Sequence, residues 1–72
     1  MTNVDKLRGK IKEKRLTPEK IADLLGIDKS TMYRKLNAGG EDFTIKQADL
    51  MSAALELDGS EAQAIFFSQF VA

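Results

Sequence analysis

Five helix-start signals follow one another along this chain, and they limit it to a set of short helices. Each signal is a small polar residue at the head of a helix-forming run, whose side chain accepts a hydrogen bond from an otherwise unpaired amide. The five predicted caps are Thr2, Thr17, Asp28, Thr44 and Ser60. No stretch alternates β-branched or aromatic residues with polar ones over a useful length, so the sequence predicts no strand.

Glycines mark most of the predicted helix ends. The first helix should run to about Arg15, and the second should end at Gly26. The third should run through Asn37 and stop at Gly39 and Gly40, because glycine readily adopts the left-handed conformation that ends a helix.

The fourth predicted helix is strongly apolar. Asp49, Ser52 and Glu56 form one narrow polar sector, while alanine, leucine and methionine cover most of the remaining surface. Such a helix is buried on more than one side, so we expect it at the centre of the molecule, packed between the first three helices and the last. Gly59 should separate it from the fifth helix.

Length and two missing residue types limit the chemistry open to the chain. Its 72 residues make one domain, and it has neither cysteine nor histidine. Disulfides, thiolate or imidazole zinc sites, cysteine nucleophiles and imidazole bases are therefore excluded. We expect a single all-α domain over residues 1–72 that is not an enzyme, needs no metal or cofactor and shows no sign of a small-molecule ligand.

The formal net charge of zero conceals an asymmetry. Residues 1–36 hold ten basic and five acidic side chains, whereas residues 37–72 hold one basic and six acidic. The N-terminal half can therefore face phosphate although the whole chain is neutral. The longest uninterrupted apolar run spans residues 64–67, so the sequence predicts no membrane span and a cytoplasmic protein.

Residues 17–36 have the pattern of two short helices joined by a tight turn. Ala22 is small where two helices cross closely, and four residues later Gly26 supplies the positive φ that reverses the chain. The second of these helices then turns six polar side chains outward, as a reader of the major groove does. They are Lys29, Ser30, Thr31, Tyr33, Arg34 and Asn37.

At these residues the sequence resembles the helix-turn-helix of the phage repressor and Cro family, known as the XRE type. The likeness lies in residues 16–22 (LTPEKIA), in the Gly26-Ile27 turn and in residues 28–32 (DKSTM). It implies a compact five-helix bundle of the lambda-repressor-like type. It also implies a small transcriptional repressor that binds a palindromic operator in double-stranded DNA as a homodimer.

Two positions depart from the family pattern. Many members have a phosphate-contacting glutamine where this chain has Pro18, so that contact is not expected here. Members also often pair an arginine of the first helix with a glutamate late in the recognition helix. Ile11 and Leu36 stand at those positions, which indicates a hydrophobic contact in place of a salt bridge.

The resemblance and the side-chain chemistry together indicate the DNA contacts. Among the six outward residues, Arg34 is the favoured base reader because a guanidinium donates two hydrogen bonds to guanine, and Lys29 and Ser30 follow. The alternative is an ordinary solvated helix face. Phosphate contacts are predicted for Thr17, Lys10, Lys14, Lys20, Lys35 and Lys46. For the lysines of the first helix the alternative is a solubilising role.

The fifth helix ends in an apolar segment that predicts a dimer surface. Its members are Ile65, Phe66, Phe67, Phe70 and Val71. The alternative is that these side chains belong to the core of one chain. A second function also stays open, a protein-interaction module of the same fold such as an antirepressor or antitoxin-like protein, because the C-terminal half is acidic and rich in phenylalanine.

Overall fold

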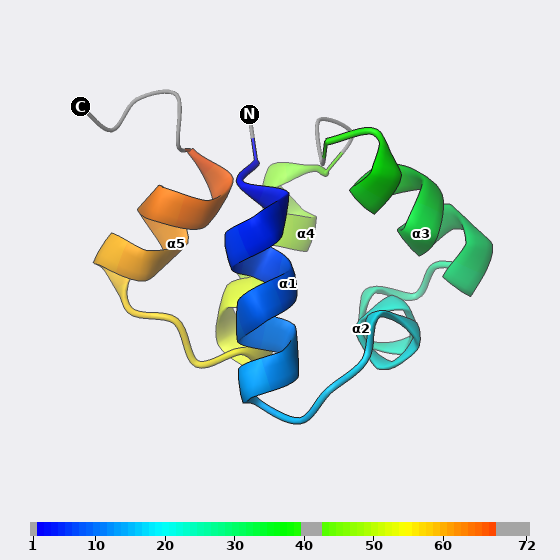
Figure 1. Ribbon diagram of the computed structural model, residues 1–72, viewed down its shortest axis with the longest axis horizontal. Coiled ribbons are helices and arrows are strands. Elements are labelled where there is room, and N and C mark those ends of the chain that lie inside the picture. The colour runs from blue at the N-terminus through cyan, green and yellow to red at the C-terminus, as the bar shows by residue number, and fades with distance from the viewer. Residues whose placement is uncertain (1, 40–42, 68–72) are drawn as a thin grey trace.

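Five helices make up the chain over residues 2–39 and 43–67, the part that this computed structural model describes (Figure 1). Their bounds are α1 Val4–Glu13, α2 Pro18–Leu25, α3 Lys29–Asn37, α4 Ile45–Ala54 and α5 Gly59–Phe66. None of these five helices is long and apolar enough to pass through a bilayer.

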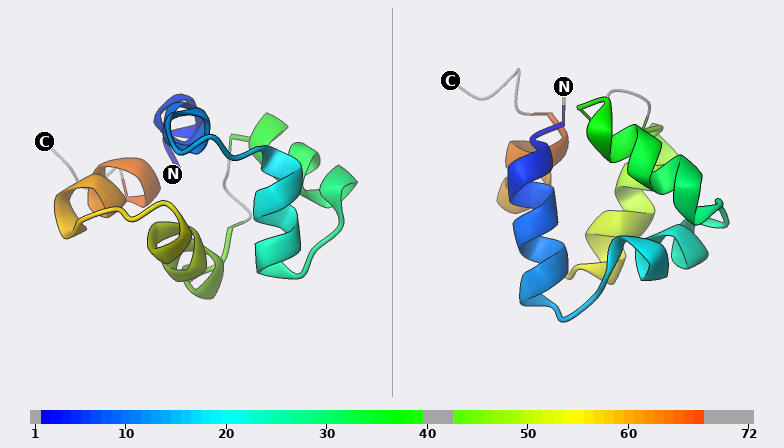
Figure 2. Two further views of the ribbon diagram at one scale, coloured as in Figure 1. Left: turned by 90° about the horizontal axis from the view of Figure 1, so that it is seen from below. Right: turned by 45° about the vertical axis from the view of Figure 1, so that its right-hand side comes forward.

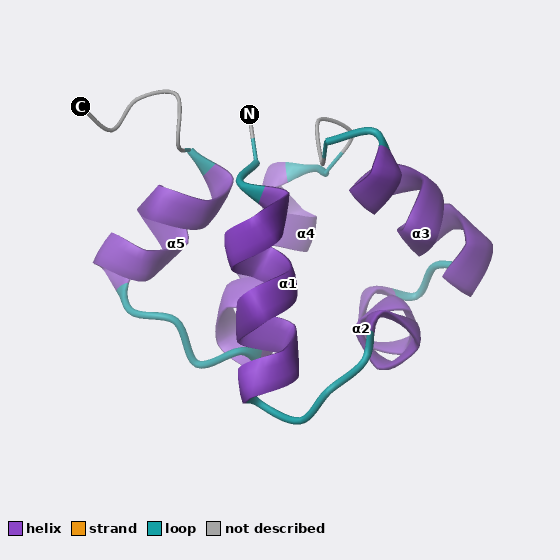
Figure 3. Ribbon diagram, in the orientation of Figure 1, coloured by secondary structure: helices purple, strands orange, loops and turns teal. Residues whose placement is uncertain are grey.

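α1 and α4 lie opposite each other, with α5 on one side of them and the α2–α3 pair on the other (Figures 1 and 2). α4 contacts both α2 and α5, and α1 contacts α5. The amide of Asn3 donates to the carbonyl oxygen of Ile65 at 2.6 Å, which joins the start of the chain to α5. The described ranges contain helices and loops but no strand (Figure 3), so the predicted all-α class is confirmed.

Three of the predicted caps are confirmed by their hydrogen bonds. The hydroxyl oxygen of Thr17 accepts from the amide of Lys20 at 3.2 Å, and Pro18 occupies the first helical position, where its missing N–H costs nothing. Thr44 and Gln47 form the predicted capping box, with both of its hydrogen bonds at 3.0 Å. Asp28 caps α3 as expected.

The predicted bounds of the first helix are wrong at both ends. Its cap is Asn3, whose side-chain oxygen accepts from the Lys6 amide at 3.1 Å, whereas Thr2 is buried one residue earlier. The helix ends at Glu13 rather than Arg15, because Arg15 adopts a left-handed conformation with φ 58° that terminates it.

The start of the fifth helix is also shifted from the prediction. Asp58, and not Ser60, is the cap, and it forms a reciprocal capping box with Glu61 at 2.7 and 3.2 Å. Gly59 is the first residue of α5 and does not separate the two helices. α4 ends instead before Glu56, whose φ of 54° is left-handed.

One hydrophobic cluster draws side chains from all five helices and the residue that follows α4. Its buried members are Leu7, Ile11, Ile21, Ala22, Met32, Leu36, Ala48, Met51, Leu55, Ile65 and Phe66. Full burial of a leucine-sized side chain is worth about 1.5–3 kcal/mol, so a core of this size holds the helices without a disulfide. Ile11 and Leu36 both belong to it, as expected for a hydrophobic replacement of a salt bridge.

α4 is less buried than its composition predicts. Ala48, Met51 and the following Leu55 face the core, but Leu50 is 41% exposed and Ala53 also lies on the surface. The expectation of burial on several sides is therefore wrong. α4 does lie between α2 and α5, as expected, but the side chains of Leu50 and Ala53 meet solvent.

Candidate nucleic-acid interface

The turn between α2 and α3 has the geometry expected from its alanine and glycine. Gly26 takes φ 71° and ψ 28°, a left-handed conformation that glycine adopts without a steric penalty. Its amide and that of Ile27 donate to the carbonyl oxygens of Asp23 and Ala22, at 3.2 and 3.0 Å. Ala22 is buried between the packed helices, so both predicted small residues act at the turn as expected.

α3 has a buried face and an exposed face. Met32 and Leu36 are buried in the core, one helical turn apart. Of the six predicted base contacts, five are exposed and Thr31 is half-buried; the exposed ones are Lys29, Ser30, Tyr33, Arg34 and Asn37. The helix contains no acidic residue and lies on the outside of the molecule (Figure 2). The structure therefore brings these residues together on one accessible surface, which we call the α3 face.

A hydrogen bond from α3 to α2 fixes one residue of the α3 face. The hydroxyl of Tyr33 donates to the carboxylate oxygen Oε2 of Glu19 at 2.8 Å. This hydroxyl lowers the pKa of the Glu19 carboxyl, and the carboxylate in turn raises the pKa of Tyr33. The positive charge of Lys29 also lowers the pKa of Glu19, by a smaller amount. The carboxylate therefore lies close enough to the α3 face to interact with its charge.

A second and longer bond connects α3 to α1. The guanidinium of Arg8 donates to the side-chain oxygen of Asn37 at 3.4 Å, across 29 residues of sequence. Both side chains are exposed, so the bond is a weak one that water or a ligand can replace. The α3 face is thus tied to α2 near its middle and to α1 at its C-terminal end.

Ser30 is held at the start of α3. Its amide and its hydroxyl both donate to the carboxylate of the cap, Asp28. The Ser30 hydroxyl is the main reason that the pKa of Asp28 lies below its usual value. With the proton of the hydroxyl directed to Asp28, the oxygen of Ser30 retains its acceptor capacity for another donor.

Four of the predicted phosphate contacts lie on or beside α2, α3 and α4. Lys20 and Lys46 are exposed, each near the N-terminal end of its helix. The ammonium of Lys35 lies 5.8 Å from the ring centroid of Phe43, a cation–π contact at the end of α3. Thr17 is exposed while its oxygen caps α2.

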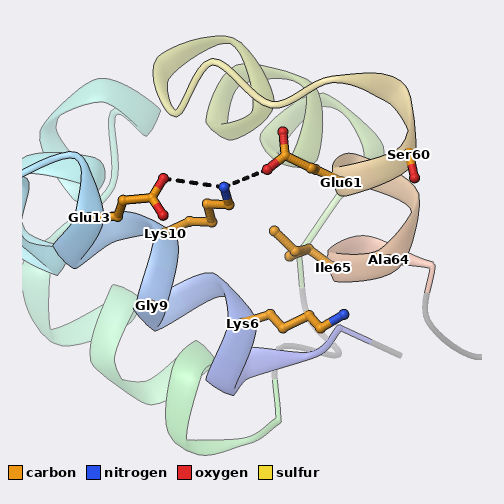
Figure 4. Close-up of a pocket in the computed structure, with 8 residues that line it drawn as sticks. All are labelled: Lys6, Gly9, Lys10, Glu13, Ser60, Glu61, Ala64 and Ile65. Atoms are coloured by element: carbon orange, nitrogen blue, oxygen red, sulfur yellow. Dashed lines mark hydrogen bonds and ion pairs between the residues drawn. The ribbon is translucent and has the colours of Figure 1, made fainter.

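The other two predicted phosphate contacts point toward the acidic half of the chain. Lys10 forms ion pairs with Glu13, at 3.2 Å, and with Glu61 of α5 (Figure 4). Lys14 pairs with Glu56 at 3.2 Å. The hydrogen bond that the ammonium of Lys10 donates to Glu61, and then the one that it donates to Glu13, raise the pKa of Lys10, while Lys10 lowers the pKa of Glu61. The structure does not bring Lys10 and Lys14 together with the α3 face.

A groove of about 510 Å³ runs between α1 and α5 beside these ion pairs (Figure 4). Gly9 and Ala64 leave it open, Ile65 forms part of its wall, and Lys6 extends along it. Its charged groups are of both signs, and three of them, Lys10, Glu13 and Glu61, already form ion pairs.

The predicted dimer surface is largely part of the monomer core. Ile65 is 2% exposed and Phe66 is 6% exposed, so neither is available to a second chain, and that part of the prediction is wrong. Their side chains pack inward because α5 needs apolar contacts against α1 and α4. Phe67 is 41% exposed and remains a candidate. Phe70 and Val71 lie outside the described residues.

Two partners of the α3 face were not predicted from the sequence, Glu19 and Arg8. Each is on a different helix from its partner, separated by 14 and 29 residues, and no local spacing signals such a pair. The available signal is Glu19 itself, which is the acidic residue nearest the start of the preceding helix and offers a carboxylate acceptor to a tyrosine hydroxyl.

Comparison of the chain with protein-family models, with curated proteins and with solved structures finds no match.

Proposed function

We propose that this protein is a sequence-specific DNA-binding regulator of the phage repressor and Cro helix-turn-helix type, with α3 as its recognition helix. The observation that carries the proposal is the α3 face, an accessible helix surface with cationic and neutral hydrogen-bonding residues and no acidic residue of its own. It follows a tight turn built on Ala22 and Gly26, which sets α3 against α2.

In this proposal the α3 face enters the major groove. Arg34 donates two hydrogen bonds to one guanine, and Lys29 and Ser30 contact bases near the start of the helix. Thr31, Tyr33 and Asn37 complete the contact surface. Phosphate is contacted by Thr17, Lys20, Lys35 and Lys46, which lie on or beside the same group of helices. Lys10 and Lys14 are left out of this set, because their ammonium groups are paired with carboxylates.

Repression then follows from occupancy of a promoter by two copies. A symmetric dimer would present two α3 faces about 34 Å apart, one turn of DNA, and would match a palindromic operator. Among the described residues of the predicted dimer surface, Phe67 is the exposed one. Sedimentation of wild type and Phe67→Ser at micromolar concentration tests this part, and an unchanged monomer in both samples would remove Phe67 from the interface.

The test of the function begins with enrichment of binding sites from a library of randomised DNA duplexes. Fluorescence anisotropy on the enriched duplex and on a scrambled one, over a series of salt concentrations, then gives affinity and specificity. We expect an enriched motif and a large preference for it. Absence of any motif, with a Kd weaker than about 10⁻⁴ M for all DNA at physiological salt, would overturn the proposal.

A protein-interaction module of the same fold is the second candidate. It is favoured by large apolar side chains that lie exposed on α4 rather than on α3, Ile45 at 73% and Leu50 at 41%. Loss of partner binding in Leu50→Ser with intact DNA binding in the same variant would support a second surface. Loss of DNA binding in that variant, with the fold intact, would argue against a partner surface on α4 that is separate from the DNA-binding surface.

A further inference from the structure

We propose that Glu19 is a specificity-determining residue of the interface, that its carboxylate accepts a hydrogen bond from the exocyclic amino group of a cytosine, and that Tyr33 positions it. The inference rests on the proposed DNA-binding function and extends it to a residue of α2. Sequence position alone assigns Glu19 to the first turn of α2, away from the recognition helix.

The geometry places the Glu19 carboxylate beside the α3 face. Tyr33 is exposed on that face, and its hydroxyl reaches the carboxylate at 2.8 Å. Glu19 is itself exposed, and the charge of Lys29 acts on it as well. A negative group is therefore held among side chains that are otherwise neutral or positive, next to the surface proposed to enter the major groove.

The chemistry of this position points to one kind of base. A carboxylate accepts hydrogen bonds and donates none, and it has room for several donors besides the Tyr33 hydroxyl. In the major groove, cytosine presents only a donor, its amino group, whereas guanine presents only acceptors, which a carboxylate repels. The same negative charge also opposes phosphate, so Glu19 weakens binding to DNA that lacks the matching base.

The positioning by Tyr33 gives the carboxylate its direction. A glutamate side chain at an exposed helix start samples several rotamers, and a base contact requires it in one of them. The Tyr33 hydroxyl restricts that choice through one exposed hydrogen bond. A purely structural role for the pair would change the stability of the fold and leave base preference untouched.

Three variants separate these effects. Glu19→Gln keeps an acceptor for Tyr33 but removes the charge and adds a donor, which suits adenine. Tyr33→Phe removes the hydroxyl and keeps the charge of Glu19. Asp23→Asn is the matched control, because Asp23 is an exposed acidic residue of the same helix, and it removes the same charge from α2.

The experiment is site enrichment from a randomised duplex library, followed by anisotropy on the enriched and scrambled duplexes. For Glu19→Gln we expect one cytosine position of the motif to shift toward adenine, tighter binding to the scrambled duplex and a specificity ratio roughly tenfold lower. For Tyr33→Phe we expect weaker base preference at that same position. Asp23→Asn should reproduce the wild-type motif.

An independent readout follows the bond itself. The chain has one tyrosine and no tryptophan, so the ultraviolet absorbance of tyrosinate reports Tyr33 alone. The carboxylate of Glu19 holds the pKa of Tyr33 above its usual value in the wild type, and this pKa should fall in Glu19→Gln. An unchanged pKa in that variant would show that the pair does not form in solution and would overturn the positioning role.

The failures of the two proposals are distinguishable. A wild-type chain that enriches no motif overturns the DNA-binding function and this inference with it. A wild-type motif that Glu19→Gln reproduces without change overturns the inference alone. A motif that shifts equally in Glu19→Gln and Asp23→Asn also overturns it, because bulk charge and not a base contact would then be responsible.

Discussion

α1 and α3 are both rich in basic residues, but their side chains meet different surroundings. On α1 the ammonium of Lys10 lies between two carboxylates, and that of Lys14, just beyond the helix, pairs with a third. On α3, Tyr33 and Asn37 each make one side-chain hydrogen bond to a neighbouring helix, and the Ser30 hydroxyl donates to the cap Asp28. A count of lysines along the sequence therefore overstates the positive surface of α1.

This difference explains how a chain of zero net charge can have a positively charged α3 face. Glu56 and Glu61 come from the acidic half, and they neutralise lysines of the basic half at the α1–α5 side. The charge of α3 has no acidic residue within its own helix to offset it. The separation of charge by halves of the sequence is therefore partly cancelled in the folded chain, where these glutamates pair with Lys10 and Lys14.

The largest expected effect tests whether α3 is held by the shared core. Leu36→Ala removes a buried side chain of α3 and should lower the free energy of unfolding by about 2–5 kcal/mol. Urea denaturation followed by circular dichroism measures it, with the exposed neighbour variant Asn37→Ala as control. A loss below about 1 kcal/mol would show that α3 packs loosely.

The next effect contrasts the two basic helices directly. Arg34→Ala should weaken binding to an enriched duplex by about 1–3 kcal/mol and have a small effect on scrambled DNA, because it removes a base contact. Lys10→Ala removes one positive charge as well, but should change binding to either duplex much less. Equal losses in the two variants would contradict the difference between α1 and α3.

A pair of identical substitutions should have opposite signs in the two regions. Gly9 lies inside α1 with nothing within 4 Å of an added Cβ, so Gly9→Ala should stabilise the protein by about 0.5–1 kcal/mol. Gly26 has φ 71°, so Gly26→Ala should destabilise it by about 1–2 kcal/mol. Thermal unfolding measures both. A destabilising Gly9→Ala would mean that α1 is distorted at that residue.

The smallest effect concerns the ion pair on α1. Lys10 lowers the pKa of Glu61, so the pair stabilises the fold above the usual pKa of glutamate, and this contribution is lost as the pH falls through the lowered value. The stability difference between wild type and Glu61→Gln should therefore be present near neutral pH and vanish in acid. Urea midpoints against pH measure it. A difference that grows in acid would have the wrong sign for an ion pair.

Local signals in the sequence were sufficient for much of the fold. Thr17, Asp28 and Thr44 cap the helices they were expected to cap, since the signal and the structure lie within one turn of each other. The first and last helices were misplaced because two capping residues lie close together at each start. Asn3, and not Thr2, takes the first cap position, and Asp58, two residues before Ser60, takes the last.

The contacts of the candidate site depend on distances that the sequence does not contain. The exposure of Leu50 depends on how many helices surround α4, and the pairing of Lys14 with Glu56 spans 42 residues. The outward residues of α3 were predictable because helical periodicity alone sets their direction. Their partners, Glu19 and Arg8, depend on how α1 and α2 pack against α3.

In the proposed function, DNA meets α3 and not the lysines of α1. The most direct measurement is a titration of the isotopically labelled protein with an enriched duplex, followed by amide chemical shifts in nuclear magnetic resonance spectra. We expect the largest shifts on residues 29–37 and on the start of α2, with small shifts along the α1–α5 groove. The largest shifts on α1 and α5, with α3 unchanged, would contradict it.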